Sequence, residues 1–347
     1  RATFFTGSIY GSTGLTSLIG SGSGRFRYNS DETSTNYTTS ITSGNYAIYR
    51  EQPSASISST TLDITYGDPL PSLTVVGVQN GDSASYTISD RVDSATGNIN
   101  VSGSPYVINT SNLSDLGYSV SGEGDGTLTV APKTVSLDVA EKVYDASTSL
   151  TGLVSITTGV SGGGITEDLS YENAVSNSKN VVTSETKYLS GIDLIDGTNG
   201  LASNYTIPTL DRDNSAAVTI HPKEVKLSAS KVFDGTTNLS SVNIFTDGSE
   251  GYLSDETLSF SSALSTSIHV ENGNNRISSI TLENGTDGNG GIATNYELPE
   301  EFTRSNAAVT ITVKTLTPTL TNTIVTKEYD GTVSAPSSFS PTYSFVG

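Results

Sequence analysis

The chain has 347 residues, contains no cysteine, methionine or tryptophan, and carries a formal net charge of −19 at pH 7. Phosphate binding needs clustered Lys and Arg, so this charge argues against nucleic acid and anionic membranes as partners. No apolar run approaches the roughly 18 residues of a membrane-spanning helix, so direct membrane insertion is not expected. Charged residues make up only 15%, and many apolar residues are Val, Ile and Tyr, which predicts an all-β protein suited to secretion.

The first 131 residues contain two segments that differ from the rest. Residues 1–52 close with SGNYAIYREQP and are predicted to be the C-terminal part of a preceding β unit, with one or two helical turns in STGLTSLIG at 12–20. Residues 53–131 carry LDITYGDPLPSLTV near their start and GDGTLTVAPK at their end. This second segment is predicted to be a β domain, β-grasp-like in type.

Two copies of one sequence pattern follow, at 132–221 and 222–313. PKTVSLDVAEKVYDA in the first copy matches PKEVKLSASKVFDG in the second, ASNYTIP matches ATNYELP, and NSAAVTIHPK matches SNAAVTITVK. Lys133, Lys223 and Lys314 fall 90 and then 91 residues apart. This period predicts tandem repeats of one small domain.

A third copy begins near 314 with VKTLTPTL and TKEYDGTVS. Residues 314–347 lack the AAVTI closing strand, so they are predicted to be an incomplete start of the repeat with an open sheet edge. We expect this segment to be poorly ordered alone, or to be completed by a neighbouring chain.

The pattern within a copy is that of short strands. Period-two alternation and Asp-Gly or Asn-Gly turns predict six or seven strands, which is typical of a small β-sandwich, Ig-like or β-grasp-like. Each closing strand runs into the next first strand across only a Pro-Lys or Val-Lys pair. Because Pro132 and Pro222 fix φ and favour extended backbone, we expect stiff connections and an elongated rod.

The phrase KVYDA, KVFDG or KEYDG opens each copy. We interpret it as a structural motif, in which a Val-aromatic pair ends the first strand, the aromatic ring covers the edge of the core, and Asp-Gly turns the chain. The first copy has Ala146 in place of glycine, which indicates that positive φ is not obligatory there. A ligand contact by the aromatic residue and Asp is the alternative. The motif residues are Tyr144, Asp145, Phe233, Asp234, Gly235, Tyr329, Asp330 and Gly331.

These phrases, with ASNY or ATNY and AAVTI, resemble the YDG repeat of large bacterial surface adhesins. ITYGDPLPSLTV with GTLTVAPK resembles their companion MBG repeat, and residues 26–53 are similar to segments of filamentous-haemagglutinin-like, two-partner-secretion exoproteins. The resemblance covers nearly the entire chain. It implies a fibrous adhesin, exported to the bacterial cell surface or secreted, and it does not identify a receptor.

Calcium is the candidate ligand with most support in the sequence. DLIDGTNG at 193–200 and ENGTDGNGG at 283–291 place oxygen ligands in glycine-rich loops, as hard cations require. Neither loop has EF-hand spacing, and a polar turn is the alternative interpretation. The candidate residues are Asp193, Asp196, Glu283 and Asp287. No other cofactor is expected.

Enzymatic activity is not expected. The two histidines, His221 and His269, are not repeated between the copies. There is no paired His, no Cys and no GxxxxGK phosphate loop, so the usual sites for metal and phosphate chemistry are missing from the sequence.

Two hypotheses for function remain. The first is a repeat stalk of an adhesin or a biofilm-matrix filament, in which neighbouring copies can associate. The second is a binding module whose repeat loops hold a host or bacterial surface glycan, a matrix polysaccharide or a protein receptor. A cluster of exposed tyrosines in one concavity favours binding, and scattered tyrosines favour the stalk.

Overall fold

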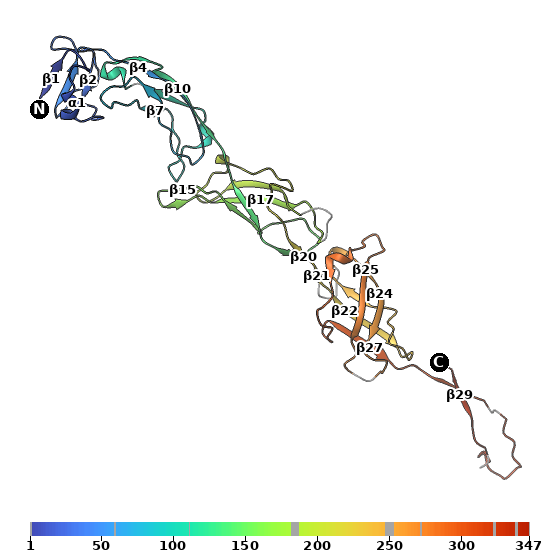
Figure 1. The fold of residues 1–347 in the computed structure, drawn as a ribbon. Helices are drawn as coiled ribbons and strands as arrows, with labels where there is room; N and C mark the ends of the chain where they lie inside the picture. Colours follow the sequence, from blue (N-terminus) through green and yellow to red (C-terminus); the bar gives the residue numbers. More distant parts are fainter. Residues whose placement is uncertain are drawn as a thin grey trace. The chain divides into compact units, whose positions relative to one another are not determined.

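A computed structural model describes residues 2–58, 60–110, 112–181, 187–246, 253–270, 273–321, 324–336 and 339–346. In this part of the chain nearly all regular structure is β, with one short α-helix and five short 3-10 helices between the strands (Figure 1). The all-β prediction is therefore confirmed. The arrangement as tandem sandwiches in a rod stays a prediction.

The chain forms two compact units, which are described separately. The first unit consists of Arg1–Ala140, Ser149–Ser176 and Tyr188–Ala217, and the second of Glu141–Thr148, Asn177–Lys187 and Val218–Gly347. The division falls inside the repeat at 132–221, because three short segments of that repeat, at 141–148, 177–187 and 218–221, group with the residues that follow it. The domain boundaries predicted from the sequence stay predictions.

The first unit begins with a parallel three-stranded sheet in the order β1, β3, β2. These strands are Thr3–Thr6, Tyr46–Tyr49 and Phe26–Arg27. The helix α1 (Gly14–Ile19) is the helical segment expected at 12–20. All four side chains of β3 are buried, and so is Tyr28 beside β2, so aromatic rings fill much of this core.

Residues 53–131 form two further sheets of the first unit. The larger has the order β5, β10, β8, β7, with bounds Thr61–Thr65, Gly124–Ala131, Tyr106–Thr110 and Tyr86–Ile88. The smaller has the order β6, β4, β9, with bounds Val75–Val76, Ser54–Ile57 and Ser119–Ser121. The 3-10 helices η1 (Val101–Gly103) and η2 (Ser114–Leu116) lie between strands. In chain order β5 is the first strand of the larger sheet and β10 is the last, and these two strands pair in parallel.

The remainder of the first unit consists of strand pairs. The long antiparallel pair joins β17 (Leu169–Ser176) to β18 (Leu189–Asp196), and the short 3-10 helix η3 (Ala202–Asn204) precedes β19. The other pairs are β11 (Lys133–Thr134) with β19 (Tyr205–Thr206), β12 (Ser136–Val139) with β14 (Val154–Thr157), and β15 (Ser161–Gly162) with β16 (Ile165–Thr166).

The second unit is built around β22 (Lys226–Val232). This strand lies between β23 (Asn243–Phe245), which is antiparallel to it, and β27 (Ala307–Thr312), which is parallel. The other elements are β24 (Leu258–Ser265) with β25 (Ile277–Asn284), β21 (Lys223–Glu224) with β26 (Tyr296–Glu297), β13 (Lys142–Val143) with β20 (Ile220–His221), η4 (Leu253–Asp255) and η5 (Ala293–Asn295).

The pairings within 222–313 repeat those within 132–221. β21–β26 corresponds to β11–β19, β22–β23 to β12–β14, β24–β25 to β17–β18, and β22–β27 to β13–β20. One difference has a simple cause in the sequence. Ala140 and Glu141 stand where the second copy has only Ser230, and this extra residue separates β12 from β13, whereas β22 is continuous.

Both long antiparallel pairs contain the same β-bulge. The register of β17–β18 shifts after Glu172, and that of β24–β25 shifts after Ser261, at the matched position of the second copy. The next residue is left-handed in each case, with φ of 53° at Asn173 and 52° at Ser262. Matched bulges are evidence that the two copies share their backbone fold here.

The described residues after 313 form one antiparallel pair, β28 (Thr317–Leu320) with β29 (Tyr343–Val346). This pair corresponds to β22–β23 of the preceding copy. All four residues of β28 are exposed. The expectation that this segment is completed by a neighbour stays a prediction.

Candidate functional site

Three carboxylates in the described part of the chain each accept hydrogen bonds from two tyrosine hydroxyls. Asp82 and Glu167 are buried, and Glu256 is partly buried. The Asp82 cluster lies in the first unit: Asp82 Oδ2 accepts from the hydroxyl of Tyr28 at 2.7 Å and from that of Tyr118 at 2.9 Å. The two rings meet edge to face, with centroids 4.5 Å apart. Tyr28 belongs to the predicted segment 1–52 and the other two residues to 53–131, so the cluster joins consecutive segments.

The Glu167 cluster, also in the first unit, joins the next two segments. Glu167 Oε1 accepts from the hydroxyls of Tyr66 at 2.7 Å and Thr96 at 2.5 Å, and Oε2 accepts from that of Tyr205 at 2.6 Å. The two tyrosine rings are 5.3 Å apart and nearly perpendicular. Tyr66 and Thr96 precede Pro132, whereas Glu167 and Tyr205 follow it.

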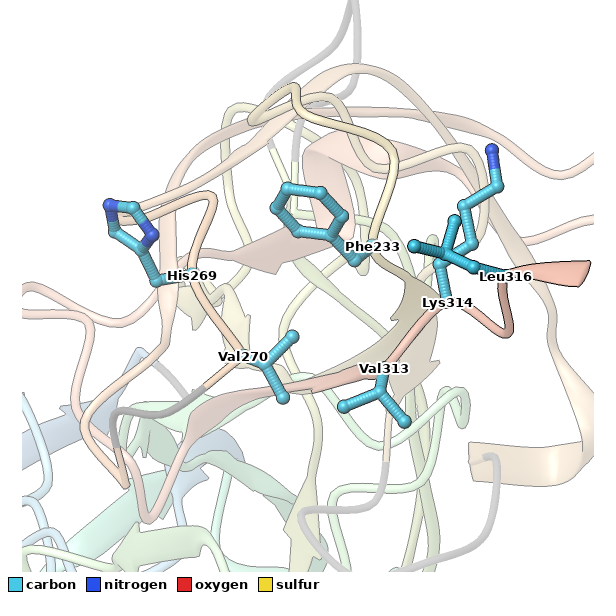
Figure 2. A pocket seen from close by; sticks show the side chains of 6 residues that line it. All are labelled: Phe233, His269, Val270, Val313, Lys314 and Leu316. Carbon is cyan, nitrogen blue, oxygen red and sulfur yellow. The ribbon is translucent and has the colours of Figure 1, made fainter. Parts of the chain in front are cut away.

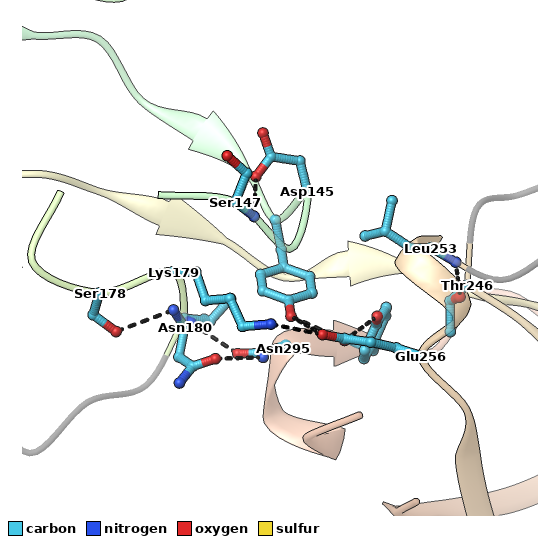
Figure 3. Close-up of polar contacts among 12 residues, drawn as sticks. Asp145, Ser147, Ser178, Lys179, Asn180, Thr246, Leu253, Glu256 and Asn295 are labelled. Carbon is cyan, nitrogen blue, oxygen red and sulfur yellow. Dashed lines mark hydrogen bonds and ion pairs between the residues drawn. The ribbon is translucent and has the colours of Figure 1, made fainter. Parts of the chain in front are cut away.

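The Glu256 cluster in the second unit has the same plan (Figure 3). The Tyr144 hydroxyl lies 2.9 Å from both carboxylate oxygens of Glu256, Tyr296 donates to Oε2 at 2.8 Å, and the Lys179 ammonium donates to Oε1 at 2.9 Å. The tyrosine rings are again nearly perpendicular, 5.4 Å apart. Tyr144 and Lys179 precede Pro222, and the other two residues follow it.

An asparagine lies next to each glutamate cluster and reaches an Asn-Val pair. Asn204 accepts a hydrogen bond from the Val101 N–H at 2.9 Å and donates to the Asn100 side chain at 2.8 Å. Asn295 makes the same two contacts with the pair Asn180–Val181, both at 2.9 Å. Each Asn is followed directly by the tyrosine of its cluster, Tyr205 or Tyr296. Two adjacent residues, an Asn-Tyr pair, therefore make both sets of contacts.

We call the receiving half of each glutamate cluster a socket. The Tyr66 socket consists of Tyr66, Asn100 and Val101, and the Tyr144 socket of Tyr144, Asn180 and Val181. In both sockets the aromatic residue donates its backbone N–H, at 2.8 Å, to the carbonyl of the last residue of a closing strand. Those carbonyls belong to Ala131 and His221. The repeated backbone contact places the aromatic ring at the same point in each copy.

Hydrogen bonding sets the charge state of the two glutamates. Burial raises the pKa of Glu167, but hydrogen bonds from Thr96 and the two tyrosines outweigh it and hold that pKa below the ordinary value. The pKa of Glu256 is lowered in the same way, with Lys179 making the largest contribution against burial. Burial, with a smaller contribution from the nearby glutamate, raises the pKa of Tyr66 to about 12. The glutamates are therefore ionised and the tyrosines protonated at neutral pH.

Asp82 differs from the glutamates in this respect. Burial raises the pKa of Asp82 and outweighs the hydrogen bonds from Tyr28 and Tyr118. Burial and the Asp82 carboxylate raise the pKa of Tyr28 as well. Ionisation of this carboxyl therefore costs more in the folded chain than in the unfolded one.

The Lys-x-aromatic-Asp phrase folds into the same turn in all three copies. The ammonium groups of Lys142, Lys231 and Lys327 lie 2.7, 2.7 and 2.8 Å from the aspartate three residues later. Each aspartate also accepts the backbone N–H two residues after it. These aspartates are Asp145, Asp234 and Asp330. Their oxygens close the turn, as the structural interpretation of the motif expects.

The aromatic residue of the phrase has a different environment in each copy. Tyr144 is buried, Phe233 is half-buried and Tyr329 is 96% exposed. The valine of the pair ends its strand as expected, at Val143 of β13 and Val232 of β22, and both valine side chains are more than half exposed. The valine side chain points away from the core since adjacent residues of a strand face opposite sides.

The interpretation that positive φ is not obligatory in this turn is also wrong. Ala146 has φ 61°, close to Gly235 at 80° and Gly331 at 74°. The turn keeps its left-handed residue even where the sequence supplies alanine. An L-residue in this region costs about 1 kcal/mol relative to glycine, so Ala146 is strained.

The calcium candidates lie as two pairs, one in each unit. Asp193 and Asp196 lie in the first unit, and Glu283 and Asp287 in the second. Each carboxylate accepts a hydrogen bond within its own hairpin or loop: from an asparagine side chain, a backbone N–H, a serine hydroxyl and a threonine hydroxyl respectively. Among the described residues, no group of three or more His, Cys, Asp or Glu side chains gathers in one place. Calcium binding stays a prediction.

The histidines have separate environments. His221 Nε2 lies 2.6 Å from Glu141 Oε2 in an exposed pair. His269 lines a cavity in the second unit. The expectation that the chain is not an enzyme stays a prediction.

Sequence analysis did not identify the glutamates or the role of the Asn-Tyr pairs. A signal was present, because Glu167 and Glu256 begin the matching stretches EDLSY and ETLSF, one repeat apart. The pairs in ASNY and ATNY were found only as landmarks of the repeat. Comparing acidic residues between the copies would have found both glutamates, but not Tyr66, which lies outside the repeated region.

Comparison of the chain with protein-family models, curated proteins and solved structures gives no match. Among the helices in the described residues, none has the length and apolarity needed to cross a membrane. The basis for a functional argument is therefore the strand pairing and the three clusters.

Proposed function

We propose that the chain is a repeat stalk of a secreted bacterial surface adhesin or of a biofilm-matrix filament. Its units set a distance and carry tension during cell adhesion. In this proposal the adhesin binds a surface glycan, a matrix polysaccharide or a protein receptor, and the chain separates that contact from the secreting cell. The resemblance to YDG and MBG repeats supports this function.

The pairing of first and last strands supports a load-bearing role and carries the proposal. β22 pairs in parallel with β27 from Leu227 with Ala307 to Val232 with Thr312, and β5 pairs in parallel with β10 in the first unit. In a parallel pair, the chain enters at one end of the ladder and leaves at the other. Tension between the two ends therefore loads all hydrogen bonds of the ladder in shear at once, whereas opposite strand directions would let them open one by one.

The clusters support the same role because they fasten consecutive segments to one another. Each contains a carboxyl group whose hydrogen bonds come from two segments. Hydrogen bonds to charged groups contribute about 1.5–3 kcal/mol, more than neutral ones. A connection of this kind resists bending and separation better than a flexible linker does.

The alternative function, a glycan- or protein-binding module, has less support. The tyrosines of the three clusters are buried. The strongly exposed tyrosines in the described residues are Tyr10 in the first unit and Tyr329 and Tyr343 in the segment after 313. Their separation along the sequence favours the stalk, since a glycan site needs several aromatic rings in one concavity.

Single-molecule force measurement tests the load-bearing role. Pulling the chain by its two ends is expected to give discrete unfolding events, each releasing about 300 Å of contour length for about 90 residues. A variant with Ser230→Cys and Thr310→Cys links facing residues of β22 and β27 in a chain that has no other cysteine. Oxidation of this variant is expected to remove one event, and a reductant to restore it.

The matched control places the disulfide outside the shear ladder. Ser228→Cys with Asn243→Cys joins β22 to β23, so the event is expected to persist with a slightly shorter length. Extension without discrete events would show that the chain does not carry load. Specific binding of a glycan by such a chain would favour the binding module instead.

A further inference from the structure

The second unit contains a third socket, which holds no Asn-Tyr pair from the described residues. A cavity of about 470 Å³ is lined by Phe233, His269, Val270, Val313, Lys314 and Leu316. Figure 2 shows the ring of Phe233 between His269 on one side and Leu316 on the other. The six residues come from three segments that match the segments of the Tyr144 socket.

The correspondence holds for the aromatic residue and its backbone contact. Phe233 follows β22 as Tyr144 follows β13, and it donates its N–H at 2.9 Å to the carbonyl of Thr312, the last residue of β27. The Tyr144 N–H reaches His221, the last residue of β20, in the same way. Phe233 therefore occupies the aromatic position of a socket.

The correspondence also holds for the Asn-Val pair. Ser265 ends β24 as Ser176 ends β17, which aligns His269–Val270 with Asn180–Val181. The two turns have the same hydrogen bond, from the N–H of Asn180 to Ser178 Oγ at 3.2 Å and from that of His269 to Ser267 Oγ at 3.0 Å. The Val270 N–H, whose counterparts bind an asparagine side chain, has no hydrogen-bond partner among the described residues.

The apolar surface next to this socket is uncovered. Leu316 aligns with Val135 and Val225, which are 3% and 1% exposed, yet Leu316 is 56% exposed. Val313 is 71% exposed as well. In the two filled sockets Val135 and Val225 are buried within the unit that carries the Asn-Tyr pair, whereas Pro132, a counterpart of Val313, is exposed as Val313 is.

We propose that the socket of Phe233, His269 and Val270 binds a further β unit of this repeat type through an Asn-Tyr pair. The asparagine side chain accepts the Val270 N–H and contacts His269, the tyrosine ring packs edge to face on Phe233, and the body of the unit covers Leu316. This inference rests on the match between sockets and not on the proposed function.

The chemistry of the third socket also determines which residue suits the occupying unit at the position that corresponds to Glu256. Phe233 has no hydroxyl, and Ile268 stands at the position of Lys179, so two of the three groups that bind Glu256 are missing. Lys314 does not replace them, because its counterpart Lys223 makes no hydrogen bond to Glu256 among the described residues. A buried carboxylate without these partners is costly. The socket therefore favours a unit with a neutral residue there.

An extended chain tests the proposal. In this extended chain, residues 1–331 are joined directly to a second copy of residues 236–313. The added residues complete the third repeat, so that its Asn-Tyr pair can reach the Phe233 socket. Hydrogen exchange at the Val270 amide is expected to slow about tenfold or more relative to the original chain, as for a newly formed and covered hydrogen bond. Changing the copied Asn295 to Ala, with the original Asn295 kept, is expected to abolish that protection.

A second pair of variants tests the preference for a neutral residue. Glu→Gln at the copied Glu256 is expected to increase protection of Val270, whereas Glu256→Gln at the original position is expected to decrease protection of the Val181 amide. A copy that folds while Val270 exchanges as before overturns the proposal. A copy that fails to fold there also overturns it, because the same residues fold at 236–313. If Gln at the copied Glu256 position leaves protection of the Val270 amide equal or lower, the preference for a neutral residue is wrong.

Discussion

At the residue scale, the chain places carboxylates in its interior and gives each of them several donors. Glu167 is 3% exposed, yet its pKa lies below the ordinary value because three hydroxyl groups compensate for the lost water. A tyrosine hydroxyl suits this task, since its ring packs in the apolar core while its oxygen remains a donor. The same residue pairing thus provides both packing and charge stabilisation.

Removing one carboxylate is expected to destabilise the first unit strongly. Glu167→Ala leaves the hydroxyls of Tyr66, Thr96 and Tyr205 without their acceptor, at a cost of about 2–4 kcal/mol. Urea unfolding followed by tyrosine fluorescence measures the loss. The control is Glu172→Ala, an exposed glutamate on β17, which is expected to change stability by less than about 0.5 kcal/mol. Equal effects of the two changes would show that the cluster adds nothing.

Stability is expected to fall at alkaline pH because of the buried tyrosines. Tyr66 loses its proton at about pH 10 in the unfolded chain and at about 12 in the folded one. Its raised pKa gives a contribution that is complete below pH 10 and is lost as pH rises through 12. Thermal unfolding across this range measures the loss, and Tyr66→Phe should flatten the curve. An unchanged slope in that variant would assign the effect to other tyrosines.

At acid pH the two glutamates make the stability depend on pH in the opposite direction, because their contribution is lost as pH falls. The pKa values of Glu167 and Glu256 are lowered on folding, so their contribution is present above about pH 4.3 and is lost as pH falls through the folded values. Asp82 acts in the other direction, because its pKa is raised. Asp82→Asn is therefore expected to steepen the acid loss of stability in thermal unfolding, and a shallower loss would contradict the assignment.

At the element scale, one turn recurs in three copies, and in the first two it directly follows the strands that end at Val143 and Val232. The lysine of the phrase binds the aspartate, and the aspartate binds the backbone two residues on, so the turn closes with local contacts alone. This local closure explains why it forms even in the segment after 313, where Tyr329 is exposed. The tertiary structure then decides whether the aromatic residue becomes part of a socket.

Exchanging alanine and glycine at matched turn positions is expected to shift stability in opposite directions. Ala146→Gly relieves a left-handed alanine and should stabilise the chain by about 1 kcal/mol, and Gly235→Ala should destabilise it by a similar amount. No atom lies within 4 Å of a Cβ added at Gly235, so the effect comes from the backbone. Urea unfolding of both variants measures it. Two changes of the same sign would contradict the argument.

At the scale of the whole molecule, the repeat period and the one- or two-residue connections predict an elongated particle. A compact globule of this length has a radius of gyration of about 20 Å, whereas a row of units each about 35–40 Å long has one near 40 Å. Small-angle scattering in dilute solution distinguishes the two. A value near 20 Å would reject the rod and the stalk function together.

The sequence by itself determined the all-β class, the helical segment at 12–20, and the matched landmarks of the two copies, because these depend on local alternation, turn residues and spacing. The strand pairings at 132–221 and 222–313 repeat as those landmarks led us to expect. Adhesin identity, the domain boundaries and calcium binding stay predictions. Local patterns say nothing about which distant groups meet.

Only the tertiary structure decided that Glu167 meets Tyr66 and that Glu256 meets Tyr144, since these partners are separated by about a hundred residues in the chain. It also showed that Val143 is exposed, which the sequence analysis had not predicted, and that Ala146 is left-handed, which it had read differently. The contacts of Glu167 and Glu256 depend on the neighbours that packing supplies, and strand alternation does not encode those neighbours. The φ of Ala146 follows from the closed turn around it, which the identity of that one residue does not reveal.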